Sequence, residues 1–139
     1  MLSHEQPVTI RFEDADPAGV VFYPRAIALA HAVVEGMISR SPLGWAGWFA
    51  SPVHAAPMRH AEADFLLPMR AGETFAARAT VERLGRTSVS FLVEFSGAEG
   101  GIAARIRTVH VLIDKASGQP VPLTPEIRRA MEGEKRDEI

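Results

Sequence analysis

The segment RAIALAHAVVEGMIS, residues 25–39, is the feature that most constrains the fold of this chain. Its apolar residues recur nearly all round a helix of 3.6 residues per turn, whereas a surface helix shows a wide polar face. Pro24 stands just before it, and proline suits the first turn of a helix because the N–H that it lacks would have no partner there. We therefore expect a long helix that fades between Ser39 and Pro42 and is buried on most of its sides.

Strand patterns dominate the rest of the chain. Before the helix, Val8, Ile10 and Phe12 alternate with polar residues, which is the period of a half-buried strand. After it, turn-forming sequences such as GAEGG and DKASGQ separate four strand-like runs. These runs cover about residues 59–65, 74–84, 87–96 and 102–113. Residues 42–57 are rich in Pro, Gly and Trp and predict a loop with at most short elements of structure, and Thr-Pro-Glu at 124–126 predicts the start of a short helix.

This order of elements predicts an α+β fold in which an antiparallel sheet of about five strands wraps around one long central helix. The 139 residues are expected to form one domain, residues 1–139, with a charged C-terminal tail at about 130–139. A sheet of this kind leaves an edge or a face uncovered. We therefore expect the chain to form at least a homodimer.

Composition excludes several kinds of chemistry. The chain has no cysteine, which removes disulfides, thiolate nucleophiles and cysteine-ligated metals, and it has neither a Gly-x-Ser-x-Gly nucleophile turn nor a glycine-rich phosphate loop. With 15 basic and 17 acidic residues and no basic block, nucleic acid is not an expected partner. The N-terminus does not resemble a secretory signal and no apolar run could span a bilayer, so we expect a cytoplasmic protein without a membrane partner.

Carboxylates and five histidines remain as candidates for chemistry. His60, Glu62 and Asp64 alternate and would share one face of a strand, but no ligand spacing such as HExxH supports a metal site, and none is predicted. His31 lies within the apolar helix. A hydrogen-bonded histidine in the core or at the edge of a pocket is the plainer interpretation of it, and a catalytic histidine is the alternative.

The sequence Asp16-Pro17-Ala18-Gly19 fits a type I turn, in which the aspartate caps its own turn. The same turn leads directly into the start of the helix near Tyr23. Free backbone N–H groups at a helix N-terminus can polarise a carbonyl, and a carboxylate beside them would suit acyl transfer without serine or cysteine. From the residues alone, a structural cap and a catalytic carboxylate both stay open.

Residues 14–26, DADPAGVVFYPRA, resemble the N-terminal signature of hot-dog-fold acyl-CoA thioesterases of the 4-hydroxybenzoyl-CoA thioesterase family. The stretches APMRHAEADFLLPMRAGETF, VERLGRTSVSFLVEF and VPLTPEIRRAM extend the similarity over almost the whole chain. The resemblance implies a hot-dog fold and hydrolysis of an acyl-CoA thioester to the free acid and CoA. It implies no cofactor, since CoA is part of the substrate, and a homodimer that associates further into a homotetramer.

By position, the resemblance makes Asp16 the catalytic carboxylate, acting as nucleophile or general base. It makes Tyr23 the residue whose backbone N–H binds the thioester oxygen, and it leaves Glu13 and Asp14 in supporting or solvated roles. Arg25 replaces an asparagine of many relatives, and His31 stands where relatives commonly carry an acidic residue. The substrate-binding residues that we expect are Gly19, Val20, Phe22, Pro24, His31, Arg86, Thr87 and Ser88.

Arg86 has two interpretations, a residue of a solvated hairpin tip and part of a phosphate-binding site. Arg83 and Arg86 flank Gly85 at a tight connection between two predicted strands, which by itself indicates a solvated hairpin tip. The alternative is a phosphate clamp, because a guanidinium group binds phosphate oxygens through paired N–H donors. Arg86, Thr87 and Ser88 fall where relatives of the hydroxybenzoyl type contact the CoA phosphates. The resemblance therefore favours the phosphate clamp.

The acyl group is open to more than one interpretation. The Pro-Ala-Gly and Phe-Tyr-Pro details of the signature favour an aromatic, 4-hydroxybenzoyl-like acyl group over a short aliphatic one. Two other functions of the same fold are a non-catalytic binder of acyl-CoA or acyl carrier protein, and a hydratase or dehydratase. The binder would not need Asp16, and the hydratase would use His31 as its catalytic histidine.

Overall fold

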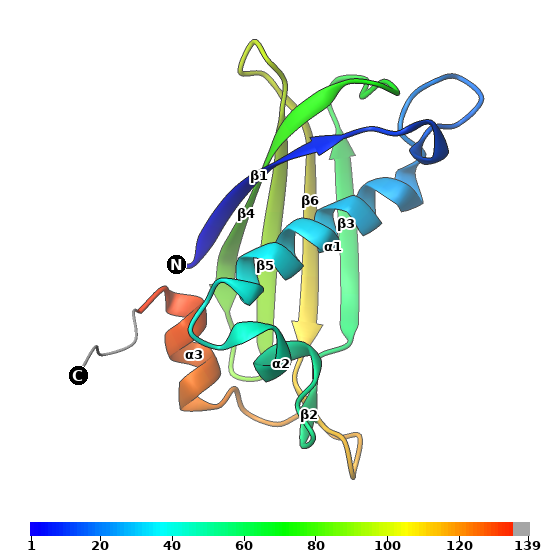
Figure 1. Ribbon diagram of the computed structural model, residues 1–139. Coiled ribbons are helices and arrows are strands. Elements are labelled where there is room, and N and C mark those ends of the chain that lie inside the picture. The colour runs from blue at the N-terminus through cyan, green and yellow to red at the C-terminus, as the bar shows by residue number, and fades with distance from the viewer. Residues whose placement is uncertain (135–139) are drawn as a thin grey trace.

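One long helix, α1 (Tyr23–Ser39), lies across one face of a five-stranded antiparallel sheet in the computed structural model, which describes residues 1–134 (Figure 1). In spatial order the strands are β1 (Ser3–Thr9), β4 (Thr74–Leu84), β5 (Ser88–Ser96), β6 (Ile102–Val111) and β3 (Met58–Phe65). The predicted α+β layout is confirmed. Residues 135–139 of the expected charged tail lie outside the described residues.

Short elements complete the fold. They are a 3-10 turn η1 (Phe12–Asp14), the helix α2 (Gly44–Phe49), the two-residue strands β2 (His54–Ala55) and β7 (Ile113–Asp114), and the helix α3 (Pro125–Glu132). As predicted, Thr124 begins α3, because its hydroxyl accepts a hydrogen bond from the Ile127 N–H. Of the helices in residues 1–134, none has the length and hydrophobicity that crossing a bilayer requires.

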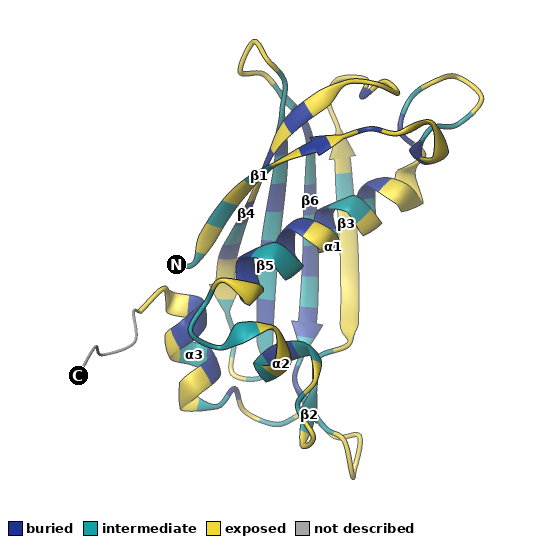
Figure 2. Ribbon diagram, viewed as in Figure 1, coloured by how far each residue is buried: buried dark blue, intermediate teal, exposed yellow. Residues whose placement is uncertain are grey.

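The core lies between α1 and the inward face of the sheet. On β4 and β5 every second residue is buried, as the period of a strand requires (Figure 2). The inward residues of these two strands are Phe75, Ala77, Ala79, Val81, Val89, Phe91, Val93 and Phe95. The helix begins and ends where the sequence predicts, but it is buried on one face only, since Ala28 and Ala32 are exposed. The prediction of burial on most sides is wrong for the single chain because the sheet covers only one face of α1.

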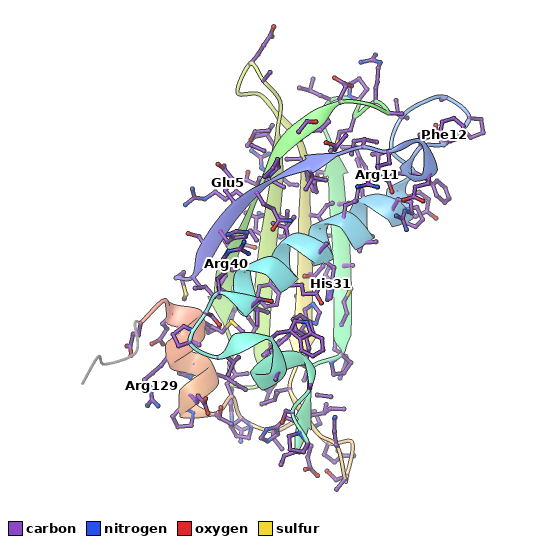
Figure 3. The ribbon with its side chains drawn as sticks, viewed as in Figure 1. Glu5, Arg11, Phe12, His31, Arg40 and Arg129 are labelled. Carbon is purple, nitrogen blue, oxygen red and sulfur yellow. The ribbon has the colours of Figure 1, made fainter. Side chains whose placement is uncertain are left out.

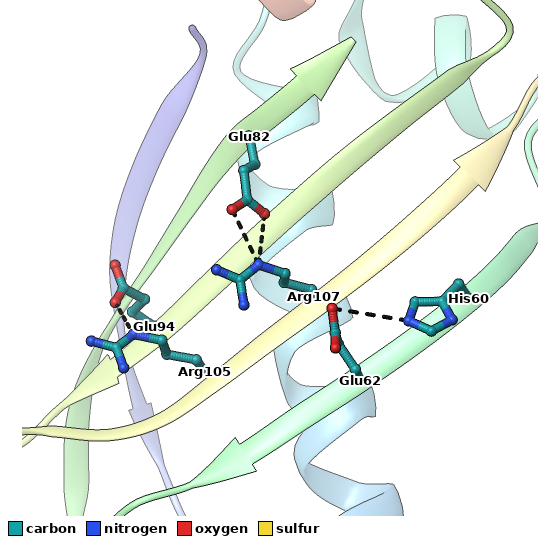
Figure 4. A network of polar contacts seen from close by, with 6 residues as sticks. All are labelled: His60, Glu62, Glu82, Glu94, Arg105 and Arg107. Atoms are coloured by element: carbon teal, nitrogen blue, oxygen red, sulfur yellow. Dashed lines mark hydrogen bonds and ion pairs between the residues drawn. The ribbon is translucent and has the colours of Figure 1, made fainter. Parts of the chain in front are cut away.

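Charged side chains line the opposite face of the sheet. Arg105 Nε on β6 lies 2.9 Å from Glu94 Oε2 on the neighbouring β5, and Arg107 Nε on β6 lies 3.0 Å from Glu82 Oε2 on β4, across β5 (Figure 4). On β3, His60 Nε2 lies 3.9 Å from Glu62 Oε1. Within residues 1–134 no group of three His, Asp or Glu side chains is placed to hold a metal ion.

The first strand ends earlier than the alternating pattern predicts. Val8 and Ile10 face the core, but Phe12 lies in η1 and is 94% exposed (Figure 3). The expectation that Phe12 shares their buried face is therefore wrong. The reason is that the chain turns away from the sheet at η1, and Asp14, not Phe12, becomes the buried residue of this segment.

Candidate active site

The Asp16 turn forms as predicted. The Gly19 N–H donates to the Asp16 carbonyl at 2.9 Å, and the Asp16 side chain accepts through Oδ1 from the N–H groups of Ala18 (2.9 Å) and Val20 (3.4 Å). Gly19 has a φ of +80°, a backbone conformation that favours glycine. Oδ2 of Asp16 accepts no hydrogen bond from the described residues. One carboxylate oxygen thus stabilises the turn while the other stays available.

Residues 14–22 form a closed loop that is held against the end of β3. The Asp16 N–H donates to the Val20 carbonyl at 2.9 Å, and the Phe22 N–H donates to the Asp14 carbonyl at 2.8 Å. The Val21 N–H donates to the Met69 carbonyl at 2.7 Å, which joins the loop to the segment that follows β3. Val20, which pairs with Asp16, stands three residues before Tyr23, so Asp16 is held roughly 10 Å from the start of α1.

Tyr23 is the first residue of α1, and its backbone N–H has no partner among the described residues. Pro24 has no N–H, while the N–H groups of Arg25 and Ala26 donate to the Phe22 carbonyl. Within residues 1–134, the Tyr23 N–H is therefore the one backbone donor of the first turn of α1 that has no hydrogen-bond partner. It lies at the positive end of the helix dipole, where it can stabilise an oxyanion.

Asp14 forms a buried ion pair that sequence reasoning missed. Its side chain is 2% exposed, and Oδ1 accepts from Arg25 Nε (3.0 Å) and Nη2 (2.8 Å) while Oδ2 accepts from the Arg11 N–H (2.9 Å). Burial raises the pKa of Asp14, but the Arg11 N–H and the Arg25 guanidinium outweigh it and hold the pKa below its ordinary value of 3.8. Arg25, the departure from the asparagine of relatives, thus joins the loop to the first turn of α1.

Breaking this pair is expected to destabilise the fold. Arg25→Met should lower the free energy of unfolding by about 3 kcal/mol, the low end for a buried pair, because Arg25 itself is 45% exposed. Asp14→Asn should also destabilise, and the double variant should lose less than the sum, since no charge is left buried without a partner. Urea unfolding of the four proteins measures this coupling; strictly additive losses would contradict it.

The same carboxylate predicts a pH dependence. A pKa that folding lowers means that Asp14 contributes its full stabilisation above the ordinary value of 3.8 and loses it as the pH falls through the lowered folded value. The stability advantage of the wild type over Asp14→Asn should therefore be constant near neutral pH and shrink in acid. Urea unfolding at a series of pH values measures it, and an advantage that persisted in strong acid would contradict the assignment.

His31 lies on the side of α1 that faces α2 (Figure 3). Its ring centroid is 5.9 Å from that of Phe49 and 5.9 Å from that of His110 on β6. These residues line a cavity of about 400 Å³ between α1, α2 and the start of β3. Sequence reasoning missed His110, because only the pairing of β5 with β6 and β3 brings this residue of the fourth strand-like run beneath the helix.

His110 is buried, at 4% exposed, and has one unsatisfied polar atom. Its Nδ1 lies 2.9 Å from the Ala56 carbonyl oxygen, while Nε2 is buried without a hydrogen-bond partner among the described residues. Burial lowers the pKa of His110, the hydrogen bond to Ala56 opposes this, and the charge of His31 adds to the lowering. An unsatisfied buried nitrogen of this kind costs about 1–3 kcal/mol.

Arg86, Thr87 and Ser88 lie at the connection between β4 and β5. The carbonyls of Arg86 and Thr87 accept from the N–H groups of Leu123 and Leu112, and the Arg86 side chain is exposed. This connection follows the end of β4, whereas the Asp16 loop lies beside the segment that precedes β4. The 11 residues of β4 span roughly 35 Å, so one protomer does not bring Arg86 and Asp16 together.

A helix wrapped by an antiparallel sheet, with a carboxylate turn at the free N-terminus of that helix, defines the class of hot-dog thioester hydrolases. The comparisons with known proteins agree. The family model described as the thioesterase-like superfamily matches residues 10–131, and the chain belongs to this family, whose hot-dog members include the 4-hydroxybenzoyl-CoA thioesterases. It is a thioester hydrolase.

Three similar proteins illustrate the relationship. A 1,4-dihydroxy-2-naphthoyl-CoA hydrolase of Nostoc punctiforme is 33% identical over 129 residues, which cover 93% of this chain and 86% of that protein. The crystal structure of a 1,4-dihydroxy-2-naphthoyl-CoA thioesterase from Synechocystis superposes with a TM-score of 0.83 at 25% identity, covering 93% of this chain and 95% of the other. A DHNA-CoA thioesterase from Staphylococcus aureus superposes with a TM-score of 0.84, covering 96% and 91% of the two chains; at 16% identity it supports the fold alone.

Proposed function

We propose that this protein hydrolyses an aromatic acyl-CoA thioester, of the hydroxylated aryl class that includes 1,4-dihydroxy-2-naphthoyl-CoA, to the aryl acid and CoA. The observation that carries the proposal is the juxtaposition of Asp16, with Oδ2 unused, and the free Tyr23 N–H on one closed loop. The similarity to the 1,4-dihydroxy-2-naphthoyl-CoA hydrolase of Nostoc punctiforme supports the aromatic class over short aliphatic acyl groups.

The chemistry follows from these two groups. In one route Asp16 Oδ2 attacks the thioester carbonyl carbon, the CoA thiolate leaves, and water then hydrolyses the mixed anhydride on Asp16 to the aryl acid. In the other route Asp16 Oδ2 takes a proton from a water molecule that attacks the same carbon, and the tetrahedral intermediate collapses to the aryl acid with loss of the CoA thiolate. The negative charge that develops on the carbonyl oxygen is stabilised by the Tyr23 N–H at the positive end of α1. A single oxyanion donor of this kind contributes about 2.7–4 kcal/mol.

The proposed enzyme is a homodimer formed through the free edge of β3. All residues of this strand except Ala63 are exposed, and the apolar Phe65, Leu66 and Leu67 at its end are exposed as well (Figure 2). An uncovered edge strand with apolar neighbours favours pairing with a second copy. Antiparallel pairing of β3 with its symmetry mate would continue the sheet across both copies.

Such pairing would complete the site. The cavity lined by His31 and His110 borders the first residue of β3, Met58, while the Asp16 loop is hydrogen-bonded to Met69, four residues after the end of β3. Antiparallel strands bring the beginning of one beside the end of the other. The Asp16 of one copy would then face the cavity of its partner, and Arg86 lies at that same end of the sheet for the CoA phosphates.

Dimer formation through β3 predicts that removing a single backbone N–H on its free edge abolishes dimerisation. The Leu66 N–H donates to the Ala103 carbonyl, and by the alternation of an antiparallel pair the Ala63 N–H points away from β6, to the free edge. Ala63→Pro should therefore convert the dimer to a monomer without breaking the pairing with β6, while Ala63→Val should not. Light scattering coupled to gel filtration measures this and also reports whether dimers associate into a tetramer; a proline variant that stayed dimeric would exclude this edge.

Release of CoA thiol from a panel of aryl and alkyl CoA esters tests the proposed activity. We expect the highest kcat/KM with hydroxylated aryl esters and lower values with short aliphatic ones. A preference for aliphatic esters would overturn the aromatic class. Saturable binding of the esters without thiol release would indicate a binder in place of an enzyme and would overturn the assignment of Asp16 as well.

A further inference from the structure

The cavity beneath α1 has a composition suited to one kind of ligand. It lies between α1, α2, β2 and the end of β6, and its lining includes the rings of His31, Trp48, Phe49, His54 and His110. The ring centroids of Trp48 and His110 are 6.5 Å apart, edge to face, and those of His31 and His110 are 5.9 Å apart. Such walls favour a planar aromatic ring. The residues that line the cavity and matter for this argument are His31, Trp48, Phe49, Met58 and His110.

A buried atom of His110, a residue that lines the cavity, determines the polarity of the group that it can accept. A carbonyl oxygen only accepts hydrogen bonds, so His110 Nδ1, at 2.9 Å from the Ala56 oxygen, carries a hydrogen. Because burial lowers the pKa of His110, the ring is neutral and its Nε2 carries a lone pair. Nε2 is buried without a partner among the described residues. It therefore requires a hydrogen-bond donor, and a carboxylate or phosphate cannot satisfy it.

We propose that this cavity binds the aryl ring of the substrate and that His110 Nε2 accepts a hydrogen bond from a ring hydroxyl remote from the thioester. This inference rests on the proposed function and narrows it to phenolic acyl groups. Nε2 is closed to solvent in the unbound chain, so a ring hydroxyl reaches it when the side chains that cover it move aside on binding. His110 is thus a specificity-determining residue that selects hydroxylated rings over otherwise identical ones.

The position of the cavity agrees with this role in the dimer. His31 is the ninth residue of α1, so it lies about 12 Å along the helix axis from Tyr23. A single aromatic acyl group does not bridge that distance within one protomer. In the antiparallel dimer, the cavity of one copy faces the Asp16 loop of the other, so the carbonyl and the remote hydroxyl contact different copies.

The test compares 1,4-dihydroxy-2-naphthoyl-CoA with 1-hydroxy-2-naphthoyl-CoA, which differ only in the hydroxyl remote from the thioester. The wild type should prefer the dihydroxy ester by about tenfold in kcat/KM, the effect of one hydrogen bond. His110→Asn keeps a donor toward the Ala56 carbonyl but removes the acceptor at Nε2, so its preference should fall to about one. His110→Gln places an amide oxygen near the Nε2 position and should restore part of the preference.

A wild type without preference, or a His110→Asn variant that lowers kcat/KM for both esters by the same factor, would overturn the proposal. If the wild type hydrolysed neither ester, the proposed function would fail, and binding of the two free naphthoic acids would decide this inference separately. Calorimetry should then show about tenfold tighter binding of the dihydroxy acid by the wild type and no difference for His110→Asn. Equal binding of both acids by the wild type would overturn it.

Discussion

Asp16→Asn is expected to lower kcat/KM for an aryl-CoA thioester by about 10²–10⁴-fold, the usual contribution of a positioned base, and by more if Asp16 is the nucleophile. The amide keeps the oxygen that accepts from the Ala18 and Val20 N–H groups, so the turn should persist. The loss therefore reports the chemistry and not the fold. Thiol release measures the rate, and thermal unfolding should show little change.

Glu13→Gln is the matched control, because it removes one negative charge from an exposed residue of η1, the turn that precedes the loop. It should retain near-normal turnover, which separates the role of Asp16 from a general effect of charge. Asp14→Asn should lose stability and retain activity per folded molecule. If Asp16→Asn turned over normally, or if Asp14→Asn were inactive while folded, the assignment within the acidic loop would be wrong.

The part of the site formed by residues close together in the sequence, the Asp16 turn and the start of α1, could be predicted from the sequence. A turn of the type Asp16-Pro17-Ala18-Gly19 is determined by neighbouring residues, and so is the helix start at Tyr23 and Pro24. The two interpretations of Asp16 that the sequence leaves open are compatible, because Oδ1 caps the turn and Oδ2 stays unused. Local rules therefore sufficed for every group that the proposed chemistry needs from this loop.

The Asp14–Arg25 pair and the position of His110 could not be predicted, because they depend on contacts that only the folded chain makes. Arg25 pairs with Asp14 because the closed loop returns the chain to α1, and no pattern of spacing indicates that return. His110 enters the cavity because of the order of strands in the sheet, and it contacts the Ala56 carbonyl, 54 residues away. The exposure of Phe12 has the same origin, since alternation in sequence predicts which residues share a face only while the strand continues.

The charged outer face of the sheet contributes little to stability, whereas the uncovered apolar surfaces favour association with a second copy. The ion pairs on the outer face of the sheet are partly exposed, and each is expected to contribute less than about 1 kcal/mol. In contrast, the free edge of β3 carries backbone donors that the single chain leaves unpaired, and the exposed side of α1 carries apolar side chains that the single chain leaves uncovered. The proposed dimer would use that edge, and this makes the arrangement of the site testable without a structure of the complex.

Mixing two inactive variants is expected to restore activity. Asp16→Asn removes the carboxylate and leaves the cavity intact, while Ala56→Trp fills the cavity and leaves Asp16 and the Ala56 carbonyl in place. If each site combines Asp16 of one copy with the cavity of its partner, a mixed dimer contains one site with both parts intact. Random exchange in a two-fold symmetric dimer should then recover about a quarter of the wild-type activity, because half of the dimers are mixed and each has one working site of two.

The experiment mixes the two purified variants, exchanges subunits through mild denaturation, and follows CoA thiol release from an aryl ester. Each variant refolded alone is the control and should stay inactive, which excludes recovery by refolding itself. The same mixture made with Ala63→Pro in both chains should recover nothing, because that substitution removes the shared edge. If the mixture of dimeric variants also stayed inactive, Asp16 would serve the cavity of its own protomer, and the antiparallel pairing of β3 would have to be replaced by an arrangement that brings those two parts of one chain together.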